Sequence, residues 1–201
     1  MLCINYLLMQ NTLNLKMASS KSEKAIFIDR DGVINEDPIG DYVKRWEDFR
    51  FIPGSVEALK RLQDSGYKIV IISNQAGIGD GVYSESALKD ITAKMLSELK
   101  KSGVTVRGIY YCLHGKEANC ACRKPKTGLF QQAANEIQFN PNETYFVGDK
   151  ASDVQAGKTF GLKTIFVLTG HGKIDKAQLS PNVRPEQILP SLKEAVDYIL
   201  K

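Results

Sequence analysis

The sequence lacks an apolar run of the roughly 18 residues that a transmembrane helix needs, and it lacks internal repeats and low-complexity segments. It also lacks a marked charge of either sign. Its 27 lysines and arginines against 23 acidic residues leave a formal charge of +4, and the basic residues are dispersed, whereas a nucleic-acid-binding protein concentrates positive charge. We therefore expect a soluble monomer with no membrane and no nucleic-acid partner.

A secretory signal is also missing. The apolar opening segment, residues 1–9, has neither a basic segment before it nor a clear small-residue cleavage site after it. We expect a cytoplasmic protein with a disordered extension over residues 1–22 and a single domain over residues 23–201. Met17, followed by the polar segment 18–22, is a plausible alternative start.

Cysteines are few, and their arrangement argues against a disulfide framework. Cys3 lies in the extension, whereas the other three gather with a histidine within eleven residues. Three thiols and an imidazole at this spacing fit a closed tetrahedral zinc site better than buried or redox-active thiols, and they indicate a reducing compartment. Two cationic residues directly follow the last ligand, and the metal would fix the direction of their side chains. The predicted ligands are Cys112, His114, Cys120 and Cys122, and the two cations are Arg123 and Lys124.

Short apolar runs alternate with helical patterns along most of the chain. With 43% hydrophobic residues, the chain can bury the core of one domain. Strands that alternate with helices imply an α/β fold with a doubly wound, mainly parallel sheet. His171 follows the last core strand and is expected to be an ordinary loop residue. The spacing predicts strands over 26–28, 67–72, 106–111, 144–148 and 163–168, and helices over 55–65, 84–101 and 126–137, from about 152 and from about 190.

Two carboxylates, Asp29 and Asp31, follow the first strand directly. Because ligands of open α/β sheets bind at the carboxyl ends of strands, they form a candidate catalytic pair or metal site, against the alternative of a solvated Asp-Gly turn. Asp149 ends a separate strand. It is either an acid near a helix N-terminus or, if the two strands are neighbours, a ligand of Mg²⁺ together with Asp29 and the backbone carbonyl of Asp31. Asp153 has the same ambiguity.

These residue types suit hydrolysis of a phosphate monoester, which needs a nucleophile, a proton donor for the leaving oxygen, and cations and hydrogen-bond donors for the phosphoryl oxygens. Asp29 would be the nucleophile. Asp31 would protonate the leaving oxygen and later activate water. The cation and the donors for the phosphoryl oxygens come later in the chain, at Ser73, Asn74, Gln75 and Lys124.

Four motifs occur in order between about residues 26 and 168: Asp-x-Asp-Gly-Val, Ser-Asn-Gln, Arg-Lys-Pro and Gly-Asp-Lys-x-x-Asp. Together they resemble the four motifs of the haloacid dehalogenase superfamily of phosphatases. The resemblance implies the roles that the chemistry asks for: nucleophile Asp29, acid and base Asp31, phosphoryl stabilisers Ser73 and Lys124, and magnesium ligand Asp149.

The cysteine and histidine loop before Arg-Lys-Pro narrows the resemblance to two branches without a large cap domain. They are the D-glycero-D-manno-heptose 1,7-bisphosphate 7-phosphatases and the histidinol-phosphate phosphatases. Segments 51–54, 108–112 and 148–150 favour the heptose branch, whereas the five residues between His114 and Cys120 are a spacing closer to the histidinol-phosphate branch. We predict a phosphatase that removes the 7-phosphate of heptose 1,7-bisphosphate, a small sugar phosphate, and that uses Mg²⁺ and Zn²⁺.

The phosphate that remains on the product needs its own cations. Arg123 is the best candidate because its planar fork suits bidentate phosphate contact, and Lys150 would assist it. The sugar would lie against the loop after the first acid pair, at Asp37, Pro38, Ile39 and Gly40.

Three alternatives stay open at this point. One is a histidinol-phosphate phosphatase. Another is a polynucleotide 3′-phosphatase of the same superfamily, although no basic stripe with interleaved aromatics is present. The last is a non-catalytic, zinc-stabilised module that binds a phospholigand, although such a module gains nothing from two uncompensated acids.

Overall fold

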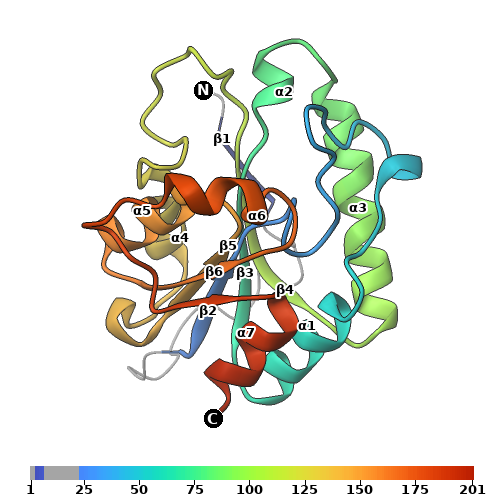
Figure 1. Cartoon of the computed structure of the whole chain (residues 1–201). Helices are drawn as coiled ribbons and strands as arrows, with labels where there is room; N and C mark the ends of the chain where they lie inside the picture. The colour runs from blue at the N-terminus through green and yellow to red at the C-terminus, as the bar shows by residue number, and fades with distance from the viewer. Residues whose placement is uncertain (1–2, 7–22) are drawn as a thin grey trace.

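The computed structural model describes residues 3–6 and 23–201 (Figure 1). Within these residues, seven strands form one sheet in the order β1-β4-β3-β2-β5-β6-β7. The strands β2 to β7 are parallel, and β1 pairs antiparallel with β4 at one edge. The bounds are β1 (Cys3–Tyr6), β2 (Ala25–Ile28), β3 (Lys68–Asn74), β4 (Val106–Cys112), β5 (Tyr145–Gly148), β6 (Lys163–Val167) and β7 (Gln187–Leu189).

Helices cover both faces of the sheet, as Figure 1 shows. Buried residues of α1 (Ser55–Asp64), α3 (Glu85–Lys101) and α7 (Leu192–Ile199) belong to one core cluster, and those of α4 (Gly128–Glu136) and α5 (Ala151–Phe160) to another. The predicted doubly wound α/β fold is therefore confirmed. Shorter helical segments are α2 (Ala76–Gly79), α6 (Gly172–Asp175), η1 (Trp46–Asp48), η2 (Pro141–Glu143) and η3 (Lys176–Gln178).

The central strand β2 is buried on both faces. Ile26 and Ile28 pack into the first cluster and Phe27 into the second, since successive side chains of a strand point to opposite faces. This two-sided burial explains why a continuous apolar run, and not an alternating one, encodes the strand.

No domain is inserted between β2 and α1. The connection over residues 29–54 contains only the short turn η1 among the elements that the structure describes. The prediction of a fold without a large cap is confirmed, and the carboxyl ends of the strands stay open.

Most predicted elements occur within a few residues of their expected bounds. Ser84, for example, caps α3 as predicted, with its Oγ accepting the backbone N–H of Ala87 at 3.1 Å. Two differences remain. The strand β3 continues through Ser73 and Asn74, where a turn was expected, and β7 with α6 was not predicted because three and four residues are too short to show a periodicity.

Part of the N-terminal segment belongs to the sheet as an edge strand. Cys3 to Tyr6, within the predicted extension, form β1 and pair with β4 from Cys112 to Ile109. Residues 1–2 and 7–22 lie outside the described residues, so the domain boundary stays a prediction. None of the helices described is long and apolar enough to cross a membrane.

Candidate active site

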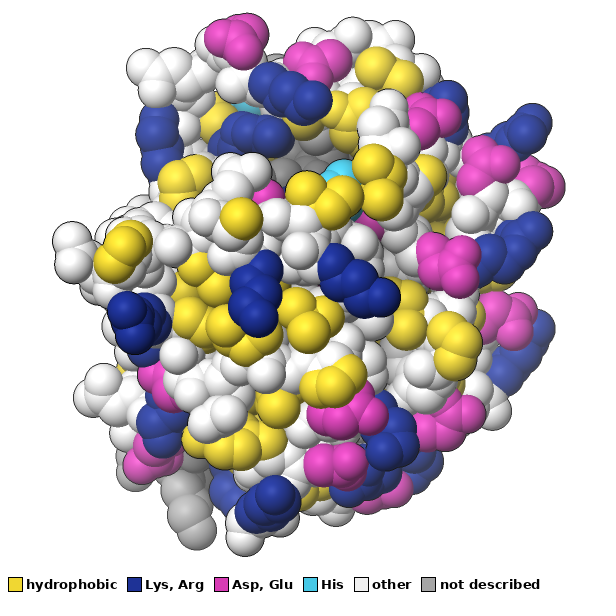
Figure 2. Space-filling model, in the orientation of Figure 1, with side chains coloured by type: hydrophobic (Ala, Val, Ile, Leu, Met, Phe, Trp, Pro, Cys, Tyr) yellow, Lys and Arg dark blue, Asp and Glu magenta, His cyan; other side chains and the backbone are white. Residues whose placement is uncertain are grey.

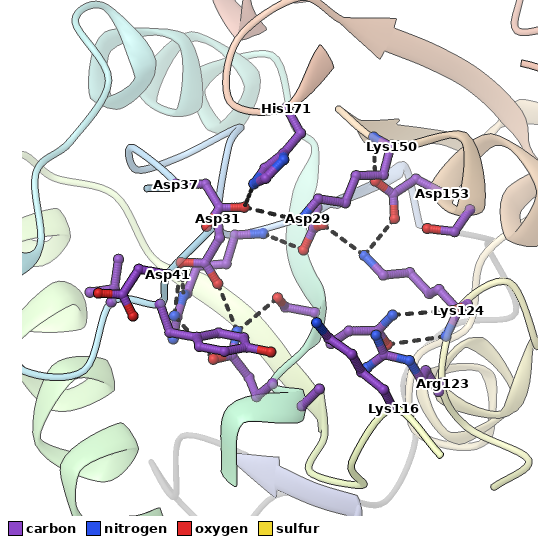
Figure 3. A pocket seen from close by; sticks show the side chains of 18 of the residues that line it. Asp29, Asp31, Asp37, Asp41, Lys116, Arg123, Lys124, Lys150, Asp153 and His171 are labelled. Atoms are coloured by element: carbon purple, nitrogen blue, oxygen red, sulfur yellow. Dashed lines mark hydrogen bonds and ion pairs between the residues drawn. The ribbon is translucent and has the colours of Figure 1, made fainter. Parts of the chain in front are cut away.

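A pocket of about 340 Å³ opens at the carboxyl ends of the central strands (Figure 3). Figure 2 shows the molecule hollowed near the top of the face drawn, with basic side chains and a histidine beside the hollow. Most of the predicted site residues meet on this pocket, and Asp149 lies buried close by. The lining includes Asp29, Asp31, Asp37, Gly40, Ser73, Asn74, Gln75, Arg123, Lys124 and Lys150.

Lys124 lies between two carboxylates. Its Nζ is 2.9 Å from Oδ2 of Asp29 and 2.7 Å from Oδ1 of Asp153, and it donates to the carbonyl of Ile72 at 3.0 Å. Burial raises the pKa of Asp29, and the Lys124 ammonium opposes this effect. Lys124 therefore supports the charged form of a buried carboxylate that lines the pocket, which is what a carboxylate nucleophile requires.

Asp149 is brought to Asp29 because β2 and β5 are neighbours, with Ile28 paired to Val147. Its Oδ2 accepts the backbone N–H of His171 at 2.8 Å, whereas its Oδ1 is buried with no hydrogen-bond partner in the described part of the chain. Burial raises the pKa of Asp149 well above its ordinary value, so its charged form calls for a cation.

The donor set at this point fits Mg²⁺. Carboxylate oxygens of Asp29, Asp149 and Asp153 lie within 4.8 Å of one another, and Mg²⁺ prefers oxygen ligands from few protein groups. The group includes Asp153, which the sequence left ambiguous. Asp153 also accepts the backbone N–H of Lys150 at 3.0 Å, at the start of α5, so it has the position of an acid near a helix N-terminus as well as a place in this group of oxygens.

Two glycines make room for the carboxylate of Asp149. A Cβ at Gly32, where φ is +84°, would lie 2.2 Å from Oδ2 of Asp149, and a Cβ at Gly170, where φ is +54°, would lie 2.4 Å from the same atom. The hydroxyl of Thr169 donates to the carbonyl of Gly32 at 2.6 Å. The turn after Asp31 and the loop after β6 are thus joined around the predicted metal ligand.

The carboxylate of Asp31 lies outside this group of oxygens and is held by neutral and cationic donors. Its Oδ1 accepts from Arg30 and Asn35, and its Oδ2 accepts from Gln75. Burial acts to raise the pKa of Asp31, but the Arg30 guanidinium and these hydrogen bonds outweigh burial and hold the pKa below its ordinary value. A metal contact through the Asp31 backbone carbonyl stays a prediction.

Ser73 and Asn74 end β3 beside the pocket. Ser73 is buried, and its Oγ accepts from the Gln75 amide at 3.0 Å. Asn74 exchanges two hydrogen bonds with the backbone of Lys124: its Oδ1 accepts from the N–H at 3.1 Å and its Nδ2 donates to the carbonyl at 3.2 Å. The side chain of Asn74 therefore fixes Lys124 in place.

Loop 36–43, the segment after the first acid pair, forms one wall. Asp37 and Gly40 line the pocket. Pro38 borders a second pocket formed with residues 44–50, and Ile39 is 70% exposed and borders neither pocket. Of the four residues predicted to line the sugar, the structure thus places two on the pocket. The reason is the turn at Gly40, with a φ of +81°, which carries the tip of the loop outward.

His171 is not the ordinary loop residue expected from the sequence. Its Nε2 lies 3.1 Å from Oδ2 of Asp37, and the same oxygen is 2.9 Å from Nζ of Lys150. Together with the bond from its backbone to Asp149, this places His171 on the pocket wall. These contacts could not be predicted from the sequence, since Asp37 and Asp149 come from two segments that lie far from His171 along the chain.

The four predicted zinc ligands lie together beyond the end of β4. Their closest Sγ and Nδ1 atoms are 3.2 to 3.7 Å apart. Sulfur ligands around a tetrahedral zinc, with bonds of about 2.3 Å, lie about 3.8 Å apart, whereas the sulfurs of a disulfide are about 2.05 Å apart. Burial raises the pKa of the Cys112 thiol to about 11, so a cation is needed to hold it as a thiolate. The cluster fits Zn²⁺.

The metal loop, residues 112–124, forms the opposite wall of the pocket. The backbone N–H of Arg123 donates to Sγ of Cys120 at 3.4 Å. Nη1 of Arg123 is buried without a hydrogen-bond partner among the described residues. Lys116, which the sequence analysis did not single out, also lines the pocket, although its position between two predicted ligands pointed to the same wall. This wall is suited to an anionic group.

The central strand ends directly before Asp29, with Asp31 two residues on, and the buried Lys124 and the acid of the neighbouring strand, Asp149, meet Asp29 there. This arrangement is typical of the haloacid dehalogenase-like phosphohydrolases. A family model described as HAD-hydrolase-like matches residues 121–195.

Known proteins narrow this class further. The D-glycero-beta-D-manno-heptose-1,7-bisphosphate 7-phosphatase of Haemophilus ducreyi is 42% identical over 184 residues, covering 88% of this chain and 98% of that protein. The D-glycero-alpha-D-manno-heptose-1,7-bisphosphate 7-phosphatase of Photorhabdus laumondii is 38% identical over 156 residues, covering 74% and 84%. A solved D,D-heptose 1,7-bisphosphate phosphatase from B. bronchiseptica, complexed with magnesium and phosphate, matches with a TM-score of 0.82 and 32% identity over 88% of this chain and 98% of that one. The chain belongs to the heptose 1,7-bisphosphate 7-phosphatase family.

Proposed function

We propose that this protein hydrolyses the 7-phosphate of D-glycero-D-manno-heptose 1,7-bisphosphate through a phosphorylated Asp29. One observation carries the proposal: Asp29 contacts Lys124 and lies within a group of oxygens that includes the buried carboxylate of Asp149. A nucleophile, a cation and a metal ligand thus meet at one point of an open pocket. The names of the relatives support the substrate.

The reaction would take two steps. In the first, an oxygen of Asp29 bonds to phosphorus while the bond from phosphorus to the sugar oxygen breaks, and Asp31 gives its proton to that oxygen. The phosphate dianion beside Asp31 favours the protonated form of this acid in the complex. In the second step Asp31 takes a proton from water, whose oxygen bonds to phosphorus and releases phosphate from Asp29. Lys124 and Ser73 would donate to the phosphoryl oxygens throughout.

Two metals belong to the proposal. Asp29, Asp149 and the backbone carbonyl of Asp31 would hold Mg²⁺, which when bound neutralises charge on the phosphoryl oxygens. The magnesium and phosphate of the solved relative support this assignment. Zn²⁺ would occupy the Cys and His cluster and hold the metal loop, and the thiols of this cluster support a reducing, cytoplasmic location.

Phosphate release tests the substrate. With Mg²⁺ present, kcat/KM for one anomer of heptose 1,7-bisphosphate is expected to exceed that for histidinol phosphate by at least about 100-fold, equivalent to about 2.7 kcal/mol of transition-state binding, and omitting Mg²⁺ should abolish release. Histidinol phosphate is the right competitor because of the short metal loop. A preference for it would overturn the substrate and leave the reaction intact. No release from either anomer of heptose 1,7-bisphosphate or from histidinol phosphate would favour the phospholigand-binding module.

The phosphate at position 1 would be held by Arg123, whose buried Nη1 has no partner among the described residues. Lys150 already shares its charge with Asp37, which leaves it the weaker candidate. Arg123→Ala should therefore lower kcat/KM for the bisphosphate by about 10- to 100-fold, the usual effect of losing hydrogen bonds to a charged group.

The same variant should change kcat/KM for heptose 7-phosphate, which lacks the second phosphate, by less than about threefold, since the lost bonds of about 1.5 to 3 kcal/mol are made only to the second phosphate. Arg107→Ala is the matched control, because Arg107 lies near the amino end of β4 and does not line the pocket. Equal losses on the two substrates would show that Arg123 acts on the transferred phosphate or on the loop as a whole.

A further inference from the structure

Both oxygens of the Asp31 carboxylate are held by side chains. Oδ1 accepts from Nε and Nη2 of Arg30 at 3.1 and 2.8 Å and from Nδ2 of Asn35 at 2.9 Å. Oδ2 accepts from Nε2 of Gln75 at 2.7 Å. The side chain of Asp31 is 15% exposed and lines the pocket. These hydrogen bonds hold its carboxylate in one orientation.

The amide of Gln75 has no hydrogen-bonding capacity left for a substrate. Its two N–H donors go to Asp31 and to Oγ of Ser73, and its carbonyl accepts from Nη2 of Arg30 at 3.2 Å and from the hydroxyl of Tyr83 at 2.5 Å. Two donors and two lone pairs are all that a glutamine amide offers. Gln75 is 2% exposed. Gln75 was predicted to contact the substrate, whereas in the structure its amide makes hydrogen bonds only to other side chains of the described residues.

Burying the charged side chain of Arg30 at this position costs free energy of desolvation. Its side chain is 1% exposed, and its Nη1 finds no hydrogen-bond partner among the residues described. The guanidinium lies 5.6 Å from the centre of the Tyr111 ring. A buried ion pair stabilises a fold no better than apolar side chains of similar volume. What Arg30 supplies, and an apolar residue does not, is a planar pair of donors that fixes one carboxylate.

We propose that Arg30 and Gln75 are positioning residues that hold the carboxylate of Asp31 where its proton reaches the leaving oxygen. The inference rests on the proposed function, because that step defines what Asp31 must reach. The amide of Gln75 has no donor left for a phosphoryl group, and Arg30 is buried behind Asp31. Each acts through Asp31, so the effect of losing either depends on how much the leaving group needs the proton.

Two kinds of ester separate this role from a structural one. When the bond from phosphorus to a sugar oxygen breaks, the alkoxide needs a proton from Asp31, whereas p-nitrophenolate departs without one. The constant kcat/KM covers the steps up to the first transfer. Gln75→Met should lower it by about 10- to 100-fold for heptose 1,7-bisphosphate, within the range of general acid catalysis. For p-nitrophenyl phosphate the same variant should lose less than about threefold, since that leaving group makes little use of the acid.

Arg30→Lys keeps the charge and loses the fork, so it should show the same selectivity with a smaller loss. Gln131→Met, on the exposed side of α4, is the matched control for the Gln75 variant. Thermal unfolding of each variant is measured beside each assay. If Gln75→Met fails to fold, the test uses Arg30→Lys, for which the loss of kcat/KM on the sugar ester is compared with the loss on p-nitrophenyl phosphate.

Equal losses on the sugar and aryl esters, or no loss on either, would overturn the proposal. Fructose 1,6-bisphosphate serves as a second alkyl ester. If wild-type protein hydrolyses it and the aryl ester but not the heptose ester, the proposed substrate fails while the positioning role is still measured.

Discussion

Replacing Asp29 with asparagine is expected to lower kcat by at least about 10³-fold, within the range found when a nucleophile is removed from a catalytic unit. The amide of asparagine cannot form the acyl phosphate, so the first step has no acceptor for the phosphoryl group. The substitution also removes a partner of Lys124 and one of the oxygens of the metal group. The three losses act on the same step and are not additive.

The fold should persist in this variant. Lys124 keeps Asp153 at 2.7 Å and the carbonyl of Ile72, so its charge is not left without a partner. Phosphate release and thermal unfolding measure the two effects separately. Asp90→Asn is the matched control, because Asp90 lies exposed on α3 and pairs with Lys94. Turnover above about one tenth of wild type, a barrier change under about 1.4 kcal/mol, would falsify Asp29 as the nucleophile.

Loss of the zinc site should have the largest effect on stability. Metal binding to a site that exists only in the folded chain contributes its free energy to folding. We expect Cys122→Ser to destabilise the protein by at least about 3 kcal/mol, which for a chain of this size lowers Tm by roughly 6 to 12 °C. Because Arg123 and Lys124 belong to the metal loop and line the pocket, kcat/KM should fall as well.

Metal analysis and calorimetry check this expectation. Wild-type protein should contain one zinc per chain and the Cys122→Ser variant much less. Ala121→Ser, an exposed position between two ligands, controls for the serine itself. A variant with an unchanged Tm, or a wild-type protein without zinc, would show that the cluster is held by packing and thiol contacts alone.

The site residues that could be predicted from the sequence are those that directly follow a strand. Asp29, Asp31 and Asp149 each follow a buried apolar run, and parallel strands bring their carboxyl ends to one edge. The order of the motifs then required only that β2 and β5 be neighbours. The metal cluster could be predicted for a similar reason, since its four ligands lie within eleven residues and need little tertiary structure to meet.

Residues whose roles depend on long-range contacts could not be assigned in the same way. Gln75 read as a substrate contact because it follows Ser73, yet the structure engages it with Asp31 and Tyr83. Arg30 lies between two site aspartates and gave no signal of its own. Pro38 and Ile39 were expected at the sugar because loop 36–43 passes over the acids, but a loop's path depends on its turns, which composition alone leaves undetermined.

The two walls of the pocket differ in how freely mutation can reshape them. In the proposed function Zn²⁺ would hold the metal loop through four ligands at once, so a change at one ligand would alter the position of every residue that the loop carries. Loop 36–43 is held in place by the ion pairs of Asp37 with Lys150 and His171, and its tip at Ile39 touches neither pocket. Divergence toward other sugars would therefore accumulate in loop 36–43, while the phosphate chemistry stays the inherited part of the enzyme.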